Sequence, residues 1–112
     1  MNISILLPYK ENYSPSYPGA VSLFVDATLK LSSYKQNISV FGNTDFKKKL
    51  YGKYINIKLP NNNFLKSQSS SYVNKFIDLQ RSINSDIIEI HNRPNYISNI
   101  NELKKKNYFI FS

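Results

Sequence analysis

Residues 1–20 read MNISILLPYKENYSPSYPGA, and this stretch decides the fold class. The apolar run at residues 3–7 is stopped by a proline, so it is too short for a helix and apolar enough for a buried strand. A long loop follows and ends at Gly19. From Ala20, apolar residues recur every three or four positions, which predicts a helix as far as Leu31.

The start of this helix is a candidate anion site. The first four N–H groups of a helix have no partner inside it, and the helix dipole is positive there. A strand that feeds a helix through a loop closed by glycine brings these groups to one point, which suits a phosphate. Gly19 and Ala20 are therefore predicted to lie near a phosphate group. A plain turn, with glycine needed for geometry alone, is the alternative.

Apolar or alternating runs predict further strands along the chain. They lie at residues 37–41, 54–59, 87–91 and 108–111. Helical spacing extends from Val73 to Asn84, after a serine-rich loop at residues 67–71 that can cap the helix. Residues 44–53 are expected to form a short helix or an irregular crossover, and residues 96–103 a further short helix.

Strands that alternate with helices indicate an α/β fold with a doubly wound parallel sheet, Rossmann-like, in a single domain of residues 1–112. We expect the strand order 3-2-1-4-5, with the third strand at an edge because its second face is polar. The core should contain Ile5, Leu7, Val40, Ile88 and Ile90.

In this order the direction of winding reverses between strands 1 and 4, and ligands bind at such a point. The loops that flank it end at Gly19 and begin at His91, so we expect one crevice between them. Arg93 could pair with a phosphate or carboxylate, and Asn92 could bind hydroxyl groups. The alternatives are a packing or capping role for His91 and a surface position for Arg93.

Composition excludes several classes of function. Zero cysteines rule out disulfides and thiolate chemistry, and a single histidine rules out a multi-histidine metal site within this chain. The three glycines do not form a dinucleotide or Walker motif. No apolar run approaches the roughly 18 residues that span a bilayer, and no secretion signal is present, so we expect a cytoplasmic protein.

The net charge of +8 and the pI of about 9.7 raise the question of a nucleic-acid partner. Only two of the fifteen basic residues are arginine, the residue that specific nucleic-acid contacts prefer. Asparagine, lysine, isoleucine and tyrosine are abundant, as an AT-rich coding sequence produces without functional demand. We therefore expect a solvated basic surface and no nucleic-acid partner.

Two segments resemble family-4 glycosyltransferases of the GT-B fold. The first is the opening strand with the loop that ends Pro18-Gly19-Ala20 and the helix after it. The second is DIIEIHNRP at residues 86–94, which is similar to the fourth-strand motif of the family. The resemblance covers the whole chain, but only the amino-terminal part of the family.

The resemblance implies that the parent enzyme moves a sugar from a nucleotide-sugar to a glycan or lipid-linked acceptor in cell-envelope polysaccharide synthesis. It implies no metal and no cofactor, and it allows peripheral association with the inner face of the membrane. Gly19 and Ala20 would approach the donor phosphates, and His91, Asn92 and Arg93 would line the acceptor side of the cleft. Many members of the family have two glycines where this chain has Gly19 and Ala20.

The resemblance also implies that the catalytic residues and the donor domain lie beyond residue 112. We accordingly expect the chain to be a truncated amino-terminal domain that is inactive alone. The competing hypothesis is a non-enzymatic doubly wound binding or regulatory domain.

Overall fold

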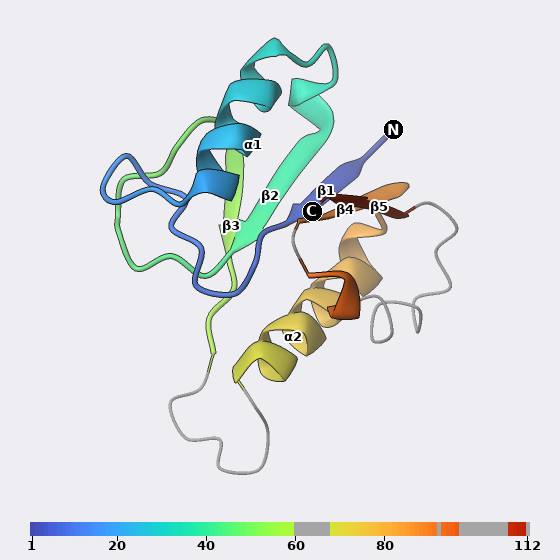
Figure 1. Cartoon of the computed structure of the whole chain (residues 1–112). Helices are drawn as coiled ribbons and strands as arrows, with labels where there is room; N and C mark the ends of the chain where they lie inside the picture. Colours follow the sequence, from blue (N-terminus) through green and yellow to red (C-terminus); the bar gives the residue numbers. More distant parts are fainter. Residues whose placement is uncertain (60–67, 92, 97–107, 112) are drawn as a thin grey trace.

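The computed structural model describes residues 1–59, 68–91, 93–96 and 108–111. Two helices flank a parallel sheet in an α/β arrangement (Figure 1). Helix α1 (Ala20–Leu31) follows the first strand, as predicted, and α2 (Gln68–Ile83) precedes the fourth. Two short 3-10 helices, η1 (Lys35–Asn37) and η2 (Pro94–Tyr96), lie in the connections.

The sheet is parallel throughout. Strand β1 (Ile3–Leu6) pairs with β2 (Ile38–Gly42) on one side and with β4 (Ile87–His91) on the other. Strand β3 (Lys53–Asn56) pairs with β2 and forms an edge. Of the predicted order 3-2-1-4-5, the part 3-2-1-4 is thus confirmed, as is the edge position of β3. A segment at Tyr108–Phe111, β5, runs parallel to β4 on its outer side.

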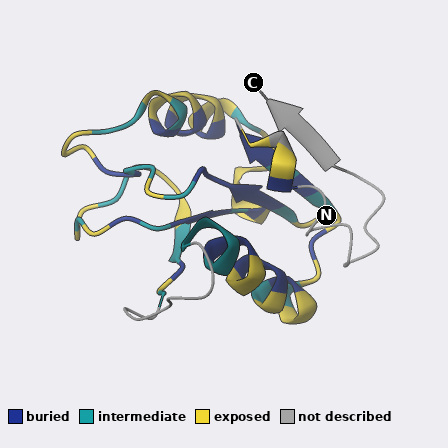
Figure 2. Ribbon diagram, turned by 60° about the horizontal axis from the view of Figure 1, so that its bottom comes forward, coloured by how far each residue is buried: buried dark blue, intermediate teal, exposed yellow. Residues whose placement is uncertain are grey.

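The two helices cover opposite faces of the sheet, α1 above and α2 below in Figure 2. Side chains of a strand alternate between the faces, so Ile5 and Leu7 pack with α1 whereas Leu6 packs with α2. The five predicted core residues are all buried. Burial of each such side chain contributes about 1.5–3 kcal/mol, so the sheet is stabilised from both sides.

Several predicted element boundaries were wrong. Helix α2 already begins at Gln68, so the serines at residues 69–71 lie within it instead of forming a capping loop. The third strand ends at Asn56, although the N–H of Ile57 still donates to Gly42 across the sheet. Tyr96 ends η2; the rest of the helix predicted at residues 96–103 lies outside the described residues.

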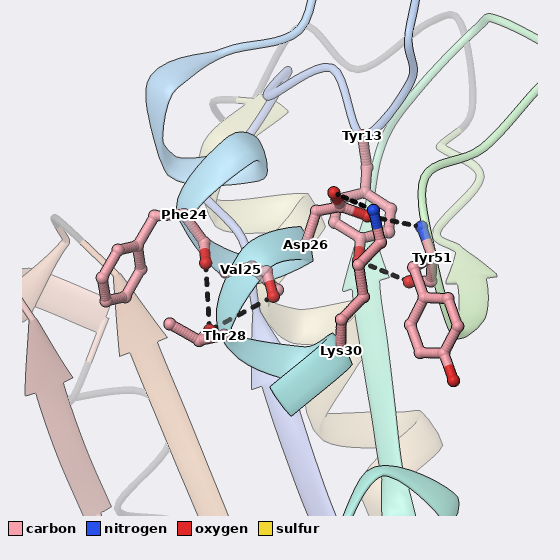
Figure 3. A network of polar contacts seen from close by, with 7 residues as sticks. All are labelled: Tyr13, Phe24, Val25, Asp26, Thr28, Lys30 and Tyr51. Carbon is pink, nitrogen blue, oxygen red and sulfur yellow. Dashed lines mark hydrogen bonds and ion pairs between the residues drawn. The ribbon is translucent and has the colours of Figure 1, made fainter. Parts of the chain in front are cut away.

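The connection from β2 to β3 is irregular and contains no helix, which is one of the two forms that the sequence allowed for residues 44–53. It is attached to α1 through Asp26, whose carboxylate accepts a hydrogen bond from the N–H of Tyr51 at 2.8 Å (Figure 3). The Tyr13 hydroxyl donates to the Tyr51 carbonyl at 2.6 Å. Burial and the Asp26 carboxylate raise the pKa of Tyr13, so this hydroxyl remains a donor. Two loops and a helix are thereby joined on the face of the sheet that α1 covers, just before β3 begins.

Asp26 also pairs with Lys30 one turn further along α1, at 3.0 Å. Burial raises the pKa of Asp26, but the hydrogen bond from Tyr51 and the pairing with Lys30 lower it, and the result lies below the ordinary value. The carboxylate is therefore charged when it anchors the loop.

Candidate functional site

The predicted anion site at the start of α1 is occupied by the chain's own carboxylate. Glu11, in the loop after β1, accepts a hydrogen bond from the N–H of Ser22 at 3.0 Å. Gly19 precedes the helix and offers no side-chain cap. A Cβ atom at Gly19 would lie 1.8 Å from the Glu11 carboxylate, so a larger residue here would push the Glu11 side chain away from Ser22. Any ligand phosphate at Gly19 and Ala20 would have to displace this carboxylate.

His91, at the end of β4, is buried on the face of the sheet that α1 covers. Its Nε2 atom lies 2.8 Å from the Glu89 carboxylate, and its ring makes an edge contact with Phe24 of α1, with centroids 6.0 Å apart. This environment is that of a packed side chain, one of the two roles open from the sequence. Arg93 is exposed after the strand, and Asn92 lies outside the described residues.

A cavity of about 580 Å³ lies at the carboxyl ends of β1, β2 and β3. We call it the polar pocket. Its described lining residues come from four places in the chain. Tyr9 and Lys10 follow β1, and Asn43, Thr44 and Asp45 follow β2. Asn56 ends β3, Lys58 and Leu59 follow it, and Gln68 begins α2. Gly19, Ala20, His91 and Arg93 are not among them, so their placement around one crevice stays a prediction.

Hydrogen bonds give the polar pocket a fixed wall. The buried Thr44 donates its hydroxyl to the Glu11 carbonyl at 3.0 Å and accepts from the N–H of Tyr13 at 3.1 Å. Its own N–H donates to Asn56 Oδ1 at 2.8 Å, and the Tyr54 hydroxyl donates to the same oxygen at 2.9 Å. The loops after β1 and β2 are thus tied to each other and to β3.

The wall keeps polar atoms available for a ligand. Asn43 uses Nδ2 to donate to the Ile57 carbonyl at 2.7 Å, and Asn56 uses Oδ1 as an acceptor. Within the described residues, the other amide atoms, Asn43 Oδ1 and Asn56 Nδ2, make no hydrogen bond. One acceptor and one donor are therefore held by half-buried, anchored side chains, an arrangement suited to hydroxyl groups.

The polar pocket was not predicted from the sequence, which placed the site between strands 1 and 4, where the direction of winding reverses. A signal was present: the alternation in residues 54–59 places Asn56 and Lys58 on one face near a strand end. In a parallel sheet the carboxyl ends of neighbouring strands share one edge, so these residues and Asn43 could have been grouped.

The described residues contain no group of three or more histidine, cysteine, aspartate or glutamate side chains that could hold a metal ion. Among the same residues, no helix is long and apolar enough to cross a membrane. No family model, no curated protein and no solved structure matches the chain.

Proposed function

We propose that the chain is the amino-terminal, acceptor-side domain of a glycosyltransferase with the GT-B fold, and that the polar pocket receives a hydroxyl-bearing acceptor. The observation that carries this proposal is the position of the pocket at the carboxyl ends of β1, β2 and β3. Parallel open sheets bind their ligands outside these strand ends. An acceptor held there would meet a nucleotide-sugar supplied by a second domain.

The chemistry of the pocket supports a polyhydroxylated ligand. Asn43 and Asn56 offer an acceptor and a donor, and the Asp45 carboxylate can accept from hydroxyl groups. The volume falls in the range of about 300–1,000 Å³ that is typical of small-molecule sites. A glycan end or the sugar of a lipid-linked acceptor fits both requirements, and a lipid-linked acceptor would bring the enzyme to the membrane surface as a peripheral protein.

The contact between Glu11 and Ser22 supports a division of labour between domains. Because the Glu11 carboxylate already accepts from one N–H of the first turn of α1 and lies against Gly19, donor phosphates reach Gly19 and Ala20 only after Glu11 moves. Tight donor binding is therefore assigned to the second domain, and His91, Asn92 and Arg93 remain candidate residues of the cleft wall.

The same contact also favours the second candidate, a doubly wound binding domain without catalysis. A carboxylate from the chain itself already provides the negative charge at this helix start, which a phosphate ligand would otherwise supply. This candidate would use the polar pocket for a small polar ligand other than a saccharide.

Binding of saccharides by the isotopically labelled chain, followed by NMR, tests the proposal. We expect a panel of hydroxylated mono- and oligosaccharides to shift the backbone resonances of Thr44 and Asn56. Asp45→Ala should weaken binding about three- to ten-fold through loss of hydroxyl contacts, whereas Asp78→Ala, an exposed aspartate on α2 outside the pocket, should leave it unchanged. A pocket that no saccharide enters would favour the second candidate.

A further inference from the structure

The rim of the polar pocket carries two exposed lysines and one exposed aspartate. Lys10 follows β1, Lys58 follows β3, and Asp45 follows β2. Counted over the described lining residues alone, the rim therefore has one excess positive charge, from groups on three separate segments. A neutral sugar would leave at least one ammonium group without a matching partner.

Lys10 has a backbone conformation that lysine disfavours. Its φ angle is +66°, in the left-handed region that glycine and asparagine adopt most easily. It is the third residue of a turn closed by a hydrogen bond from the N–H of Glu11 to the Pro8 carbonyl at 3.1 Å. Glycine would fit this turn position without strain.

The surrounding contacts hold this conformation in place. The Glu11 carbonyl is bonded to Thr44, and the N–H of Tyr9 donates to the Tyr96 hydroxyl at 3.3 Å. The Lys10 ammonium lies 5.6 Å from the centre of the Tyr9 ring. A strained residue fixed on both sides and placed at a cavity rim is a feature of binding sites.

We propose that the polar pocket selects saccharides that carry an acidic group, either a carboxylate or a phosphate on the sugar. This proposal rests on the proposed function and deepens it by naming the ligand class. Lys10 and Lys58 bind the acidic group, and Asn43 and Asn56 bind hydroxyl groups of the same ring.

Asp45 gives the pocket a second level of selection. Its carboxylate accepts hydrogen bonds from hydroxyl groups and repels a bare anion. A sugar acid presents both a hydroxyl for Asp45 and an acidic group for the lysines, whereas inorganic phosphate presents charge alone.

Titration of the labelled chain with four probes tests this selection. The probes are methyl β-D-glucuronide, its neutral counterpart methyl β-D-glucoside, glucose 6-phosphate and inorganic phosphate. We expect the two acidic sugars to shift the Thr44 and Asn56 resonances with a Kd about ten-fold lower than the neutral sugar. Comparison of the two acidic sugars identifies which acid the site prefers.

Three variants distinguish a loss of affinity caused by the missing charge from one caused by misfolding. Lys58→Ala and Lys10→Gly should each weaken binding of the preferred acidic sugar about three- to ten-fold and weaken binding of the neutral sugar less, so that the preference for the acidic sugar falls. Lys10→Gly should also raise Tm, because glycine relieves the strain, so its lost affinity cannot come from misfolding. Lys35→Ala, which removes an exposed lysine of η1 outside the pocket, should change nothing.

Each failure has a distinct meaning. Equal affinity for neutral and acidic sugars, or no effect of the two rim variants, would overturn the acidic selection and leave the proposed function standing. Inorganic phosphate that binds as tightly as the sugar acids would replace the selection with a simple anion site. Absence of binding by every sugar would overturn both proposals together.

Discussion

The carboxylate of Glu11 accepts a hydrogen bond from the N–H of Ser22, eleven residues further along the chain, at 3.0 Å. A negative charge thus sits at the positive end of α1, where a ligand anion was expected. The contact joins the loop after β1 to the helix that the loop feeds, and the Glu11 carboxylate fills the space where a side chain at Gly19 would begin.

Removal of this carboxylate should destabilise the domain. We expect Glu11→Ala to lower the free energy of unfolding by about 0.5–2 kcal/mol, as loss of a helix cap does. Gly19→Ala should cost a similar amount, because its new methyl group displaces the flexible Glu11 side chain. Urea denaturation measures both. The double variant should cost little more than either single variant; full additivity would show that the two residues act separately.

Asp26 should make the free energy of unfolding depend on pH. Its pKa lies below the ordinary value, so its contribution is complete above the unfolded-state pKa of about 3.9 and is lost as pH falls through the folded-state pKa. We expect Asp26→Ala to cost about 1–3 kcal/mol at pH 7, since the Tyr51 N–H loses its acceptor.

Denaturation curves between pH 7 and pH 2 check this expectation. The stability difference between the parent chain and Asp26→Ala should shrink in acid. Asp78→Ala is the control: this exposed carboxylate pairs with Arg81 on the surface of α2, where such pairs contribute about 0–1 kcal/mol. If the stability difference between the parent chain and Asp26→Ala did not change with pH, the charged form of Asp26 would not be what holds the loop.

A charge in the sheet core should abolish folding. Ile88 is fully buried on the α2 face of β4. An aspartate there would place a carboxylate among apolar side chains, at a cost comparable with a typical domain stability of about 5–15 kcal/mol. We expect Ile88→Asp to lose its folded circular dichroism spectrum. Ile88→Val should remain folded, with a free energy of unfolding lower by about 0.5–1.5 kcal/mol. If Ile88→Asp were folded, Ile88 would not be a core residue.

The chain alone should show no transferase activity and weak affinity for nucleotide-sugars. Stabilisation of a transition state in a two-domain cleft needs groups from both walls. The few polar contacts of one wall contribute about 0.5–1.5 kcal/mol each and must offset an association cost of at least about 4 kcal/mol. Calorimetric titration with a panel of nucleotide-sugars, together with a turnover assay, measures both quantities. Micromolar donor binding or measurable transfer would contradict the proposed division of labour.

Local patterns were sufficient to predict the α/β class, the helix at Ala20–Leu31 and the order of four parallel strands, because hydrophobic period and crossover handedness constrain them strongly. The start of α2 was missed because serines that favour caps can also occupy the first turn of a helix. The site was harder to predict because its position depends on tertiary contacts. Nothing local to Glu11 reveals that it will reach the start of α1, and the contacts of Thr44 with Glu11 and Tyr13 link residues more than thirty positions apart.

The edge position of β3 determines the order in which the molecule should open. An edge strand has one neighbour, and the irregular connection before β3 gives it no crossover helix of its own. Segments of this kind open locally at lower free energy than a central strand such as β1. Amide hydrogens of β3 should therefore exchange with solvent sooner than those of β1. Because Asn56 ends β3 and lines the polar pocket, a bound ligand would slow exchange throughout this strand, so that an edge strand that opens easily would report whether the pocket is occupied.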